Sequence, residues 1–302
     1  MKTCKPQTDV SEIRCLPAAA LSCSSGGAAA DLPVDPDPSP QPAVAAVKVV
    51  SFNIRVDSRD EHGWDCRREA AARMVGEERP TVMGLQEAQP HQITYLAKNC
   101  PDYAWYGLGR DTGRVPAATD SYAAEECMAI FWRTADAELL DKGTFWLSET
   151  PDKVSYGWDA DYRRTAAWCR FRLKATGKEF FYMNTHLDNK GPQAREQSIR
   201  LIVEQLAELN AAGSTAFLTA DFNSSTSSAI FDPLRSVLTD ARTHAPAADT
   251  GGTYNAWGTK STVIDHIFYK KAAPGGFNVL RRNYGVTYIS DHYPVEAIFR
   301  VQ

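Results

Sequence analysis

Acid, amide and imidazole side chains recur in this sequence beside short apolar runs. Runs of this length and composition predict buried strands. Carboxylates bind hard divalent cations, imidazoles carry protons, and amides hold oxygen atoms through hydrogen bonds. Several strand edges carrying such groups would suit metal-assisted phosphoryl chemistry. The segments concerned are residues 51–53, 84–87, 184–186, 220–223, 264–268 and 290–292.

Acidic residues in two of these segments are candidates for binding a metal and a water molecule. Glu87 follows the apolar run 82–86, where a carboxylate at the end of a buried strand suits Mg²⁺. A helix-capping or ion-paired glutamate is the alternative. Asp221 and Asn223 lie two residues apart, so an extended chain would point both side chains the same way. They would orient a water molecule and a phosphoryl oxygen, and an Asx turn is the alternative.

Two histidines are candidates for moving protons. His186 ends an apolar run, from which it would neutralise developing charge or protonate the leaving oxygen. A histidine that only bonds a nearby carbonyl is the alternative. Asp265 lies inside an apolar strand, and because a buried lone carboxylate is costly we expect His292 to be its partner. His266 points to the opposite side of that strand and is expected to be structural.

From residue 47 onward, the elements that would position these groups alternate between strand and helix. Asp65 is placed to cap a helix over 66–79, and Pro192 to open the longest helix, 192–210. Strands of mixed pattern with few, long helices predict sheets packed together and covered by helices on the outside. The predicted strands are 47–53, 81–86, 128–132, 145–147, 166–173, 180–185, 216–220, 264–269 and 295–299.

Composition narrows the class of substrate. The 302 residues are 43% hydrophobic, which is enough for a sizeable core, and no apolar run reaches the roughly 18 residues of a membrane-spanning helix. The net charge is −4, whereas proteins that grip long nucleic acids are usually basic. We therefore expect a small or local phosphoester substrate and no strong non-specific nucleic-acid binding.

The seven cysteines lack paired CxxC spacing, which favours buried thiols or one incidental disulfide over a zinc site.

The first 46 residues predict a separate amino-terminal part. Residues 1–23 end in a small-residue, weakly apolar stretch that resembles a bacterial lipoprotein signal, in which Cys23 would be acylated. Acids near the start and a proline inside the stretch depart from that pattern, and a disordered start is the alternative. Residues 24–46 are rich in proline and predict a disordered linker. We expect an exported, periplasmic or cell-surface lipoprotein, tethered to a membrane through Cys23, with one domain over 47–302.

In their order and strand context, the motifs resemble the endonuclease/exonuclease/phosphatase superfamily, the deoxyribonuclease-I-like fold. The resemblance implies an α/β (α+β) four-layer sandwich, with two mixed β-sheets packed face to face and helices outside. It also implies metal-dependent phosphoester hydrolysis at one rim, with Mg²⁺ or Mn²⁺ as the cofactor. The resemblance covers residues 47–302 and rests on Ser51-Phe52-Asn53, Gly84-Leu85-Gln86-Glu87, Asn184-Thr185-His186, Asp221-Phe222-Asn223, Ile264-Asp265-His266-Ile267 and Ser290-Asp291-His292.

On the metal side, the resemblance implies that Glu87 is the principal metal ligand. Asn53 would lie beside it and Asp291 near the metal. Asp221 and Asn223 would align the nucleophilic water and the phosphate.

On the proton-transfer side, the resemblance implies two catalytic histidines. His292, held by Asp265, would be the first. His186 would be the second, and Glu126 is the candidate for its carboxylate, although the neighbouring Glu125 leaves that choice open.

Some positions depart from the superfamily pattern or narrow the branch. Arg55 stands where some members have a second acid, and Ala220 replaces the usual glycine before the Asp-x-Asn pair. Residues 143–151 and 157–160 resemble secreted bacterial members and share features with the deadenylase branch. The departures at Arg55 and Ala220 do not remove an expected catalytic group.

Three further residues are candidates for binding the substrate. Arg163 and Arg164 would suit a phosphate, and Trp158 a base or a sugar. A packed surface loop is the alternative for this stretch.

Together the motifs predict a divalent-metal-dependent phosphoester hydrolase in which water attacks a phosphoryl group in line. The sequence favours a phosphodiesterase. A phosphomonoesterase or a lipid or inositol phosphatase on the same core, and a non-catalytic surface binding lipoprotein, are the alternatives. The expected substrates are a nucleotide, an oligonucleotide, a phospholipid head group or a sugar phosphate.

Overall fold

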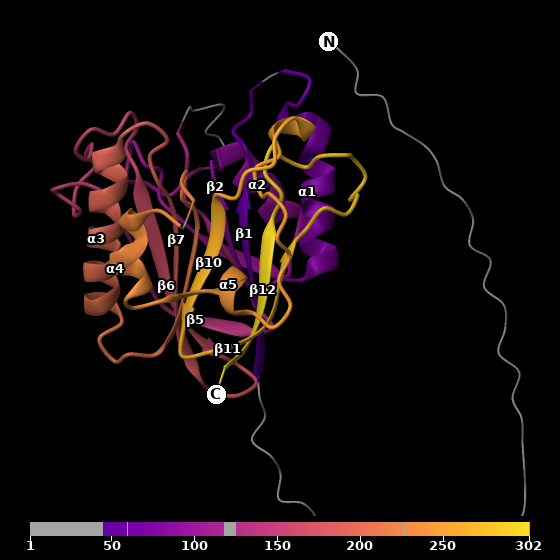
Figure 1. Cartoon of the computed structure of the whole chain (residues 1–302). Coiled ribbons are helices and arrows are strands. Elements are labelled where there is room, and N and C mark those ends of the chain that lie inside the picture. Colours follow the sequence, from indigo (N-terminus) through magenta and orange to yellow (C-terminus); the bar gives the residue numbers. More distant parts are fainter. Residues whose placement is uncertain (1–44, 59, 118–124, 226, 302) are drawn as a thin grey trace, which may run out of the picture. The chain divides into compact units, whose positions relative to one another are not determined.

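The computed structural model describes residues 45–58, 60–117, 125–225 and 227–301 (Figure 1). The predicted signal and nearly all of the predicted linker, Cys23 included, lie outside these residues. The first strand begins at Ala45, two residues before the predicted start of the domain. No helix in the described ranges is long and apolar enough to cross a membrane.

The described residues form two six-stranded mixed sheets. The first has the order β11-β12-β1-β2-β4-β3 and the second β5-β6-β7-β8-β10-β9. The first sheet consists of β1 (Ala45–Asn53), β2 (Val82–Gln86), β3 (Tyr103–Tyr106), β4 (Ile130–Arg133), β11 (Ala273–Val279) and β12 (Val295–Val301). The second consists of β5 (Ala137–Trp146), β6 (Thr165–Leu173), β7 (Glu179–His186), β8 (Thr215–Asp221), β9 (Thr239–Asp240) and β10 (Asp265–Lys270).

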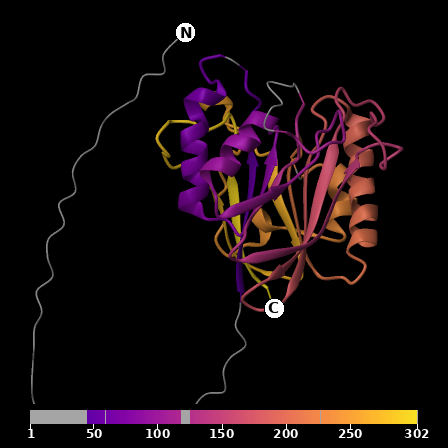
Figure 2. The ribbon, with the colours of Figure 1, turned by 180° about the vertical axis from the view of Figure 1, so that it is seen from behind.

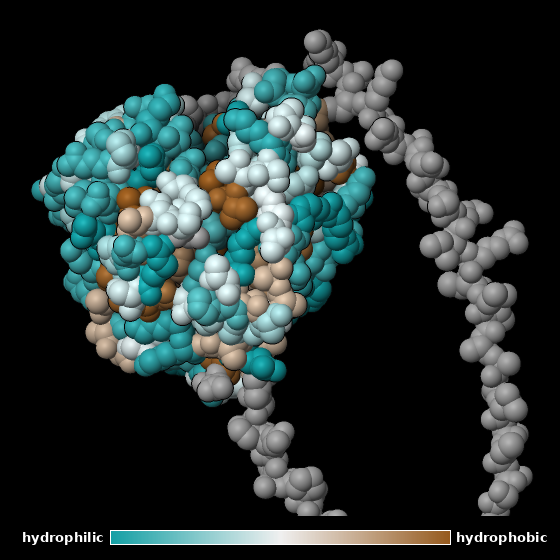
Figure 3. Space-filling model, viewed as in Figure 1, coloured by the Kyte–Doolittle hydropathy of each residue, from teal (hydrophilic) through white to brown (hydrophobic). Residues whose placement is uncertain are grey.

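Helices cover the outer faces of both sheets. In Figures 1 and 2, α1 (Trp64–Glu78) and α2 (Pro90–Asn99) lie against the first sheet, and α3 (Pro192–Leu209) and α4 (Asp232–Arg235) against the second. Three buried apolar clusters fill the spaces between the layers: one between the sheets, around Phe217 and Phe299, and one beneath each helical layer. On the face seen in Figure 3, hydrophilic residues predominate and the hydrophobic areas are small and separate. The predicted four-layer sandwich is confirmed.

The structure differs from the sequence-based elements mainly at short or polar segments. Helix α1 begins at Trp64 with Gly63 as its N-cap, so Asp65 lies in the first turn instead of capping it. An acid there still suits the positive end of the helix dipole. Helix α2, the short helix α5 (Ala241–His244) and strands β3, β9 and β11 were not predicted. Three predicted buried thiols are confirmed, at Cys100, Cys127 and Cys169.

Strand direction brings the chemical groups to one rim of the sandwich. Strand β1 is parallel to β2, and β7 is parallel to β8, so each pair ends at the same edge of its sheet. Asn53, His186 and Asp221 are the last residues of β1, β7 and β8. Strand β10 runs antiparallel to β8 and begins at Asp265, directly opposite Asp221. His292 lies just before β12, which runs antiparallel to β1.

Buried polar side chains fix the two sheets to each other below this rim. Gln86 on β2 donates a hydrogen bond to the Asn184 side chain on β7 over 2.7 Å. Thr219 on β8 donates to the same Asn184 oxygen over 3.0 Å. Gly84 leaves the space for this network, because a Cβ atom there would lie 2.5 Å from Thr219 Oγ1. The network therefore sets the relative position of the strand ends that carry the site.

Candidate active site

A cavity of about 530 Å³ opens at this rim between the two sheets. Most of the predicted site residues line it, from both sheets and from the loops between them. The predicted residues in its wall are Glu87, Glu126, Arg164, His186, Asp221, Asn223, Asp291 and His292. Asn53 and Asp265 contact this wall from behind through Glu87 and His292.

Glu87 is held rigidly at the cavity wall from the first sheet. Its backbone is left-handed (φ 58°), and its carboxylate accepts hydrogen bonds from Asn53 Nδ2 at 3.0 Å and from the Val56 N–H at 3.1 Å. Burial raises the pKa of Glu87, but the Asn53 hydrogen bond and the charge of Arg55 outweigh it, so that the pKa is lowered. Glu87 is therefore a preorganised anion.

Asn53 links the carboxylates of the two sheets. Its side-chain nitrogen donates to Asp221 Oδ2 as well as to Glu87, over 3.0 Å in each case. Its side-chain oxygen accepts the N–H of Arg55. Asn53 thus lies beside Glu87 as expected, but it presents a donor nitrogen to both acids and not a ligand oxygen.

Asp221 is buried at the centre of the site. Burial raises its pKa to about 7, and the charge of Asp265 adds to this rise. The Asn223 N–H donates to Asp221 Oδ1 at 2.9 Å, which is the Asx turn considered from the sequence. Both side chains also line the cavity, so the turn serves to present them there.

His292 forms the expected pair with Asp265. Nδ1 of His292 lies 2.9 Å from Asp265 Oδ2, and Nε2 lies 3.7 Å from Asp221 Oδ2. Burial would lower the pKa of His292, but the charges of Asp265 and Asp221 raise it to about 10. At neutral pH the ring is therefore a cation beside Asp221.

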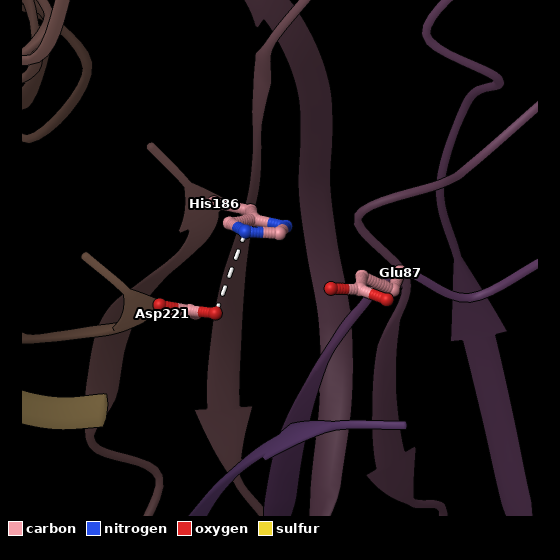
Figure 4. Close-up of side chains that lie close together, drawn as sticks. All are labelled: Glu87, His186 and Asp221. Carbon is pink, nitrogen blue, oxygen red and sulfur yellow. Dashed lines mark ion pairs between the residues drawn. The ribbon is translucent and has the colours of Figure 1, made fainter. Parts of the chain in front are cut away.

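His186 faces Glu87 across the cavity (Figure 4). Its charge state is the opposite of that of His292. Its Nε2 lies 2.9 Å from Asn223 Nδ2 and 3.4 Å from Asp221 Oδ2. Burial lowers the pKa of His186 well below its usual value, and the charge of Arg164 lowers it further. The imidazole is neutral, and accepting from Asn223 at Nε2 leaves the proton on Nδ1.

The expected partnership of His186 with Glu126 is not formed, since no hydrogen bond joins them in the described part of the chain. Glu126 Oε2 lies instead 2.7 Å from Arg110 Nη1. A backbone hydrogen bond from Arg110 N–H to the Glu126 carbonyl brings these two residues together. Burial raises the pKa of Glu126 to about 7 despite the charge of Arg110.

Comparison with known proteins agrees with this arrangement. The sequence profile of the Endonuclease/Exonuclease/phosphatase family matches residues 50–292. This chain belongs to that family. Its members are generally hydrolases of phosphoester bonds that use divalent metals.

Three relatives show how far the likeness extends. A solved endonuclease/exonuclease/phosphatase family protein from Bacteroides thetaiotaomicron is 33% identical, with a TM-score of 0.78, and the match covers 86% of this chain and 99% of that one. A solved mannosyl-6-phosphatase from Bacteroides thetaiotaomicron VPI-5482 is 34% identical, with a TM-score of 0.75, covering 83% of this chain and 98% of that one. The uncharacterized protein L388 of Acanthamoeba polyphaga mimivirus is 24% identical over 283 residues, which is 84% of this chain and 100% of that protein.

The donor set fits the divalent metal that the family implies. Ligand atoms of Glu87, His186 and Asp221 all lie within 4.8 Å of one another, and Asp291 lines the same wall. The carboxylates suit Mg²⁺ or Mn²⁺, whereas Nε2 of His186 already accepts a hydrogen bond from Asn223. The group Asp221, Asp265 and His292 is equally compact, but Asp265 is already bonded to His292 behind the cavity.

Of the predicted substrate residues, only Arg164 lines the cavity. Nε of Arg164 lies 3.3 Å from Oδ2 of Asp188. Arg163 points elsewhere, because it pairs with Asp111 at 3.1 Å and lies over the Tyr156 ring. Trp158 is also outside the cavity wall, within a turn where its φ is 46°.

Several residues of the cavity were not predicted as functional. Arg110 and Tyr162 form the wall next to Arg164, and Tyr254 lies with its ring centroid 4.9 Å from that of His292. Arg110 and Tyr254 occupy loops without a strand pattern, so the strand-end rule does not find them. Arg55, noted from the sequence as a departure, is also part of the wall.

Proposed function

We propose that this chain is a divalent-metal-dependent phosphomonoesterase that acts on a small phosphate ester such as a sugar phosphate. One observation carries the proposal: Asp221, backed by His292 and Asp265, faces Glu87 across a single cavity. An anion that can bind a cation and a carboxylate that can accept a proton thereby border one cation-sized space, and the cavity that opens beside them has room for a phosphoryl group.

The side chains of the cavity divide the work of hydrolysis. Glu87 and Asp291 would hold a divalent cation, which would supply neutralisation of charge on the phosphoryl group. Asp221 orients the attacking water and takes its proton, because His292 is already protonated and cannot act as the base. Nε2–H of His292 donates to an oxygen that gains charge in the transition state, and the neutral ring of His186 borders the same space. Asn223 fixes the orientation of the His186 ring.

The charge at the far wall of the cavity favours a monoester over the diester that the sequence favoured. Arg110 and Arg164 lie next to His186 and within 5.5 Å of the exposed Tyr162 ring, and each guanidinium is paired with a carboxylate, of Glu126 and Asp188 respectively. A phosphate monoester carries one more terminal oxygen and more negative charge than a diester, so it gains more from this wall. A relative of 34% identity is a mannosyl-6-phosphatase, which supports the same choice.

A comparison of matched substrates tests this proposal. The purified protein is assayed with Mg²⁺ and with Mn²⁺ against p-nitrophenyl phosphate, bis-p-nitrophenyl phosphate and a hexose 6-phosphate. We expect higher kcat/KM for the monoesters and complete loss of activity in EDTA. Preference for the diester would favour a phosphodiesterase, and absence of turnover would favour the non-catalytic binding protein.

Export and a lipid anchor at Cys23 remain a proposal from the sequence.

A further inference from the structure

One cationic side chain lies within the acidic side of the cavity. The guanidinium of Arg55 is located between two carboxylates, with Nη1 3.6 Å from Glu87 Oε2 and Nε 3.5 Å from Asp291 Oδ2. These are the two acids that the proposed function assigns to the divalent cation. Arg55 is one-third exposed at its side chain, so the guanidinium also borders the open space of the cavity.

The backbone, and not the ion pairs, holds Arg55 in this place. Its φ is 63°, a left-handed conformation that is rare for residues other than glycine. Its carbonyl accepts hydrogen bonds from Arg67 at 2.7 Å and from Gln92 at 2.8 Å, and its N–H donates to Asn53. Such a conformation persists only where the surroundings fix it.

The ion pairs themselves are long and incompletely satisfied. Charge-assisted hydrogen bonds between a guanidinium and a carboxylate usually measure about 2.7–2.9 Å. Both contacts of Arg55 exceed this, and its Nε is buried without a hydrogen-bond partner among the described residues. The guanidinium therefore neutralises Glu87 and Asp291 at a distance, without occupying their oxygens as a close ligand would.

Two consequences follow from this placement. A divalent cation that approaches Glu87 and Asp291 is repelled by Arg55, which weakens its binding. Once that cation has neutralised the acids, the guanidinium loses its attraction to them, and its free N–H groups are directed to the nearest anion in the cavity. In a phosphoester hydrolase that anion is the phosphoryl group of the substrate.

We infer that Arg55 is an exchangeable counter-ion: it neutralises Glu87 and Asp291, gives way to the divalent cation there, and then binds the phosphoryl group. This inference rests on the proposed function for the identity of the anion. It assigns to Arg55 two opposite effects, since it weakens metal binding and strengthens phosphate binding. A merely structural arginine would have neither effect.

Calorimetric titrations test both effects without turnover. In the first, Mg²⁺ is titrated into the wild type, Arg55→Ala, Arg55→Gln and Arg55→Lys, with Arg170→Ala as the control. Arg170 is a partly exposed arginine on β6 that pairs with Asp141 at 3.2 Å and is not part of the cavity wall. We expect Mg²⁺ to bind Arg55→Ala and Arg55→Gln about tenfold more tightly than the wild type, because one nearby positive charge is removed. Arg55→Lys and Arg170→Ala should remain close to the wild type.

In the second titration, inorganic phosphate is added at saturating Mg²⁺. We expect Arg55→Ala and Arg55→Gln to bind phosphate about tenfold more weakly than the wild type, and Arg170→Ala to be unchanged. Unchanged or weaker Mg²⁺ binding in Arg55→Ala and Arg55→Gln would overturn the inference, as would unchanged phosphate binding. If these shifts occur but no phosphoester is hydrolysed, the proposed function fails while the role of Arg55 as a counter-ion stands.

Discussion

His292 Nδ1 lies 2.9 Å from Asp265 Oδ2, on the side of the ring that faces away from Asp221. The two carboxylates approach the ring from β10 and β8, which pair directly at these residues. Asp265 thereby fixes both the orientation of the ring and its positive charge. The three residues form one unit, in which Asp221 and His292 line the cavity and Asp265 lies behind His292.

Replacing Asp265 with asparagine should separate its electrostatic role from its structural one. Asp265→Asn keeps the size of the side chain but removes the charge that raises the pKa of His292. We expect kcat to fall by about 10²–10⁴-fold while the circular dichroism spectrum stays unchanged. Histidine ring signals in NMR should show that His292, protonated across the neutral range in the wild type, loses its proton at lower pH in the variant. A variant with full kcat would show that Asp265 has no part in catalysis.

The rate should depend on pH through Asp221 and His292. Asp221 must be ionised to accept a proton, and burial raises its pKa to about 7. A bound cation stabilises the carboxylate, so the acidic limb of the kcat/KM profile should lie at or below pH 7. His292 must stay protonated, and its raised pKa of about 10 should place the alkaline limb there. Because the charge of Asp265 raises the pKa of both Asp221 and His292, Asp265→Asn should move both limbs to lower pH, and a profile unaffected by this variant would contradict the assignment.

Replacement of two glycines with alanine should change the free energy of unfolding in opposite directions, because their surroundings differ. A Cβ at Gly84 would lie 2.5 Å from Asn184 Cγ and from Thr219 Oγ1, inside the network between the sheets. Gly84→Ala should lower the free energy of unfolding by roughly 2–3 kcal/mol. Gly76 is exposed in α1 with nothing within 4 Å of its Cβ position, so Gly76→Ala should raise it by roughly 0.5–1 kcal/mol. Urea denaturation would measure both changes, and equal effects would refute the packing argument.

A buried arginine supports the loop that carries Arg55. Arg67 on α1 is fully buried and donates hydrogen bonds to the carbonyls of Ile54, Arg55, Val56, His62 and Ile289. Burial lowers its pKa to about 10. Arg67→Met would remove these five hydrogen bonds and should cost roughly 2–5 kcal/mol of unfolding free energy.

The adjacent Arg68 provides the control for Arg67. It is half-buried, lies over the Tyr95 ring and pairs with Asp65 at 2.6 Å on the same helix. Arg68→Met should change the unfolding free energy by no more than about 0.5 kcal/mol. Similar losses in the two variants would show that the hydrogen bonds of Arg67 do not stabilise the loop.

The sequence predicted those parts of the site that follow a strand pattern. Glu87, His186 and Asp221 each end an apolar run, and such runs keep their register because one slip would expose the core. The partnership of Asp265 with His292 followed from the cost of a buried charge. Both the fold and this pair are confirmed by the structure.

The remaining features depend on loops, where the sequence carries little information on geometry. Arg163 and Arg164 are adjacent and chemically identical, yet only Arg164 lines the cavity, because a loop decides which side chain turns inward. Glu126 was expected to pair with His186. Its carboxylate instead forms an ion pair with Arg110, which lies on a neighbouring loop. The left-handed backbone of Arg55 likewise depends on Arg67 and Gln92, which are distant in sequence.

The most direct test of the central claim is phosphate release from a hexose 6-phosphate at saturating Mg²⁺ by the wild type and Asp221→Asn. The account predicts EDTA-sensitive release by the wild type and a rate at least about a hundredfold lower in Asp221→Asn, with an unchanged circular dichroism spectrum. Equal rates in the two proteins, or no release from any phosphoester with Mg²⁺ or Mn²⁺, would contradict it.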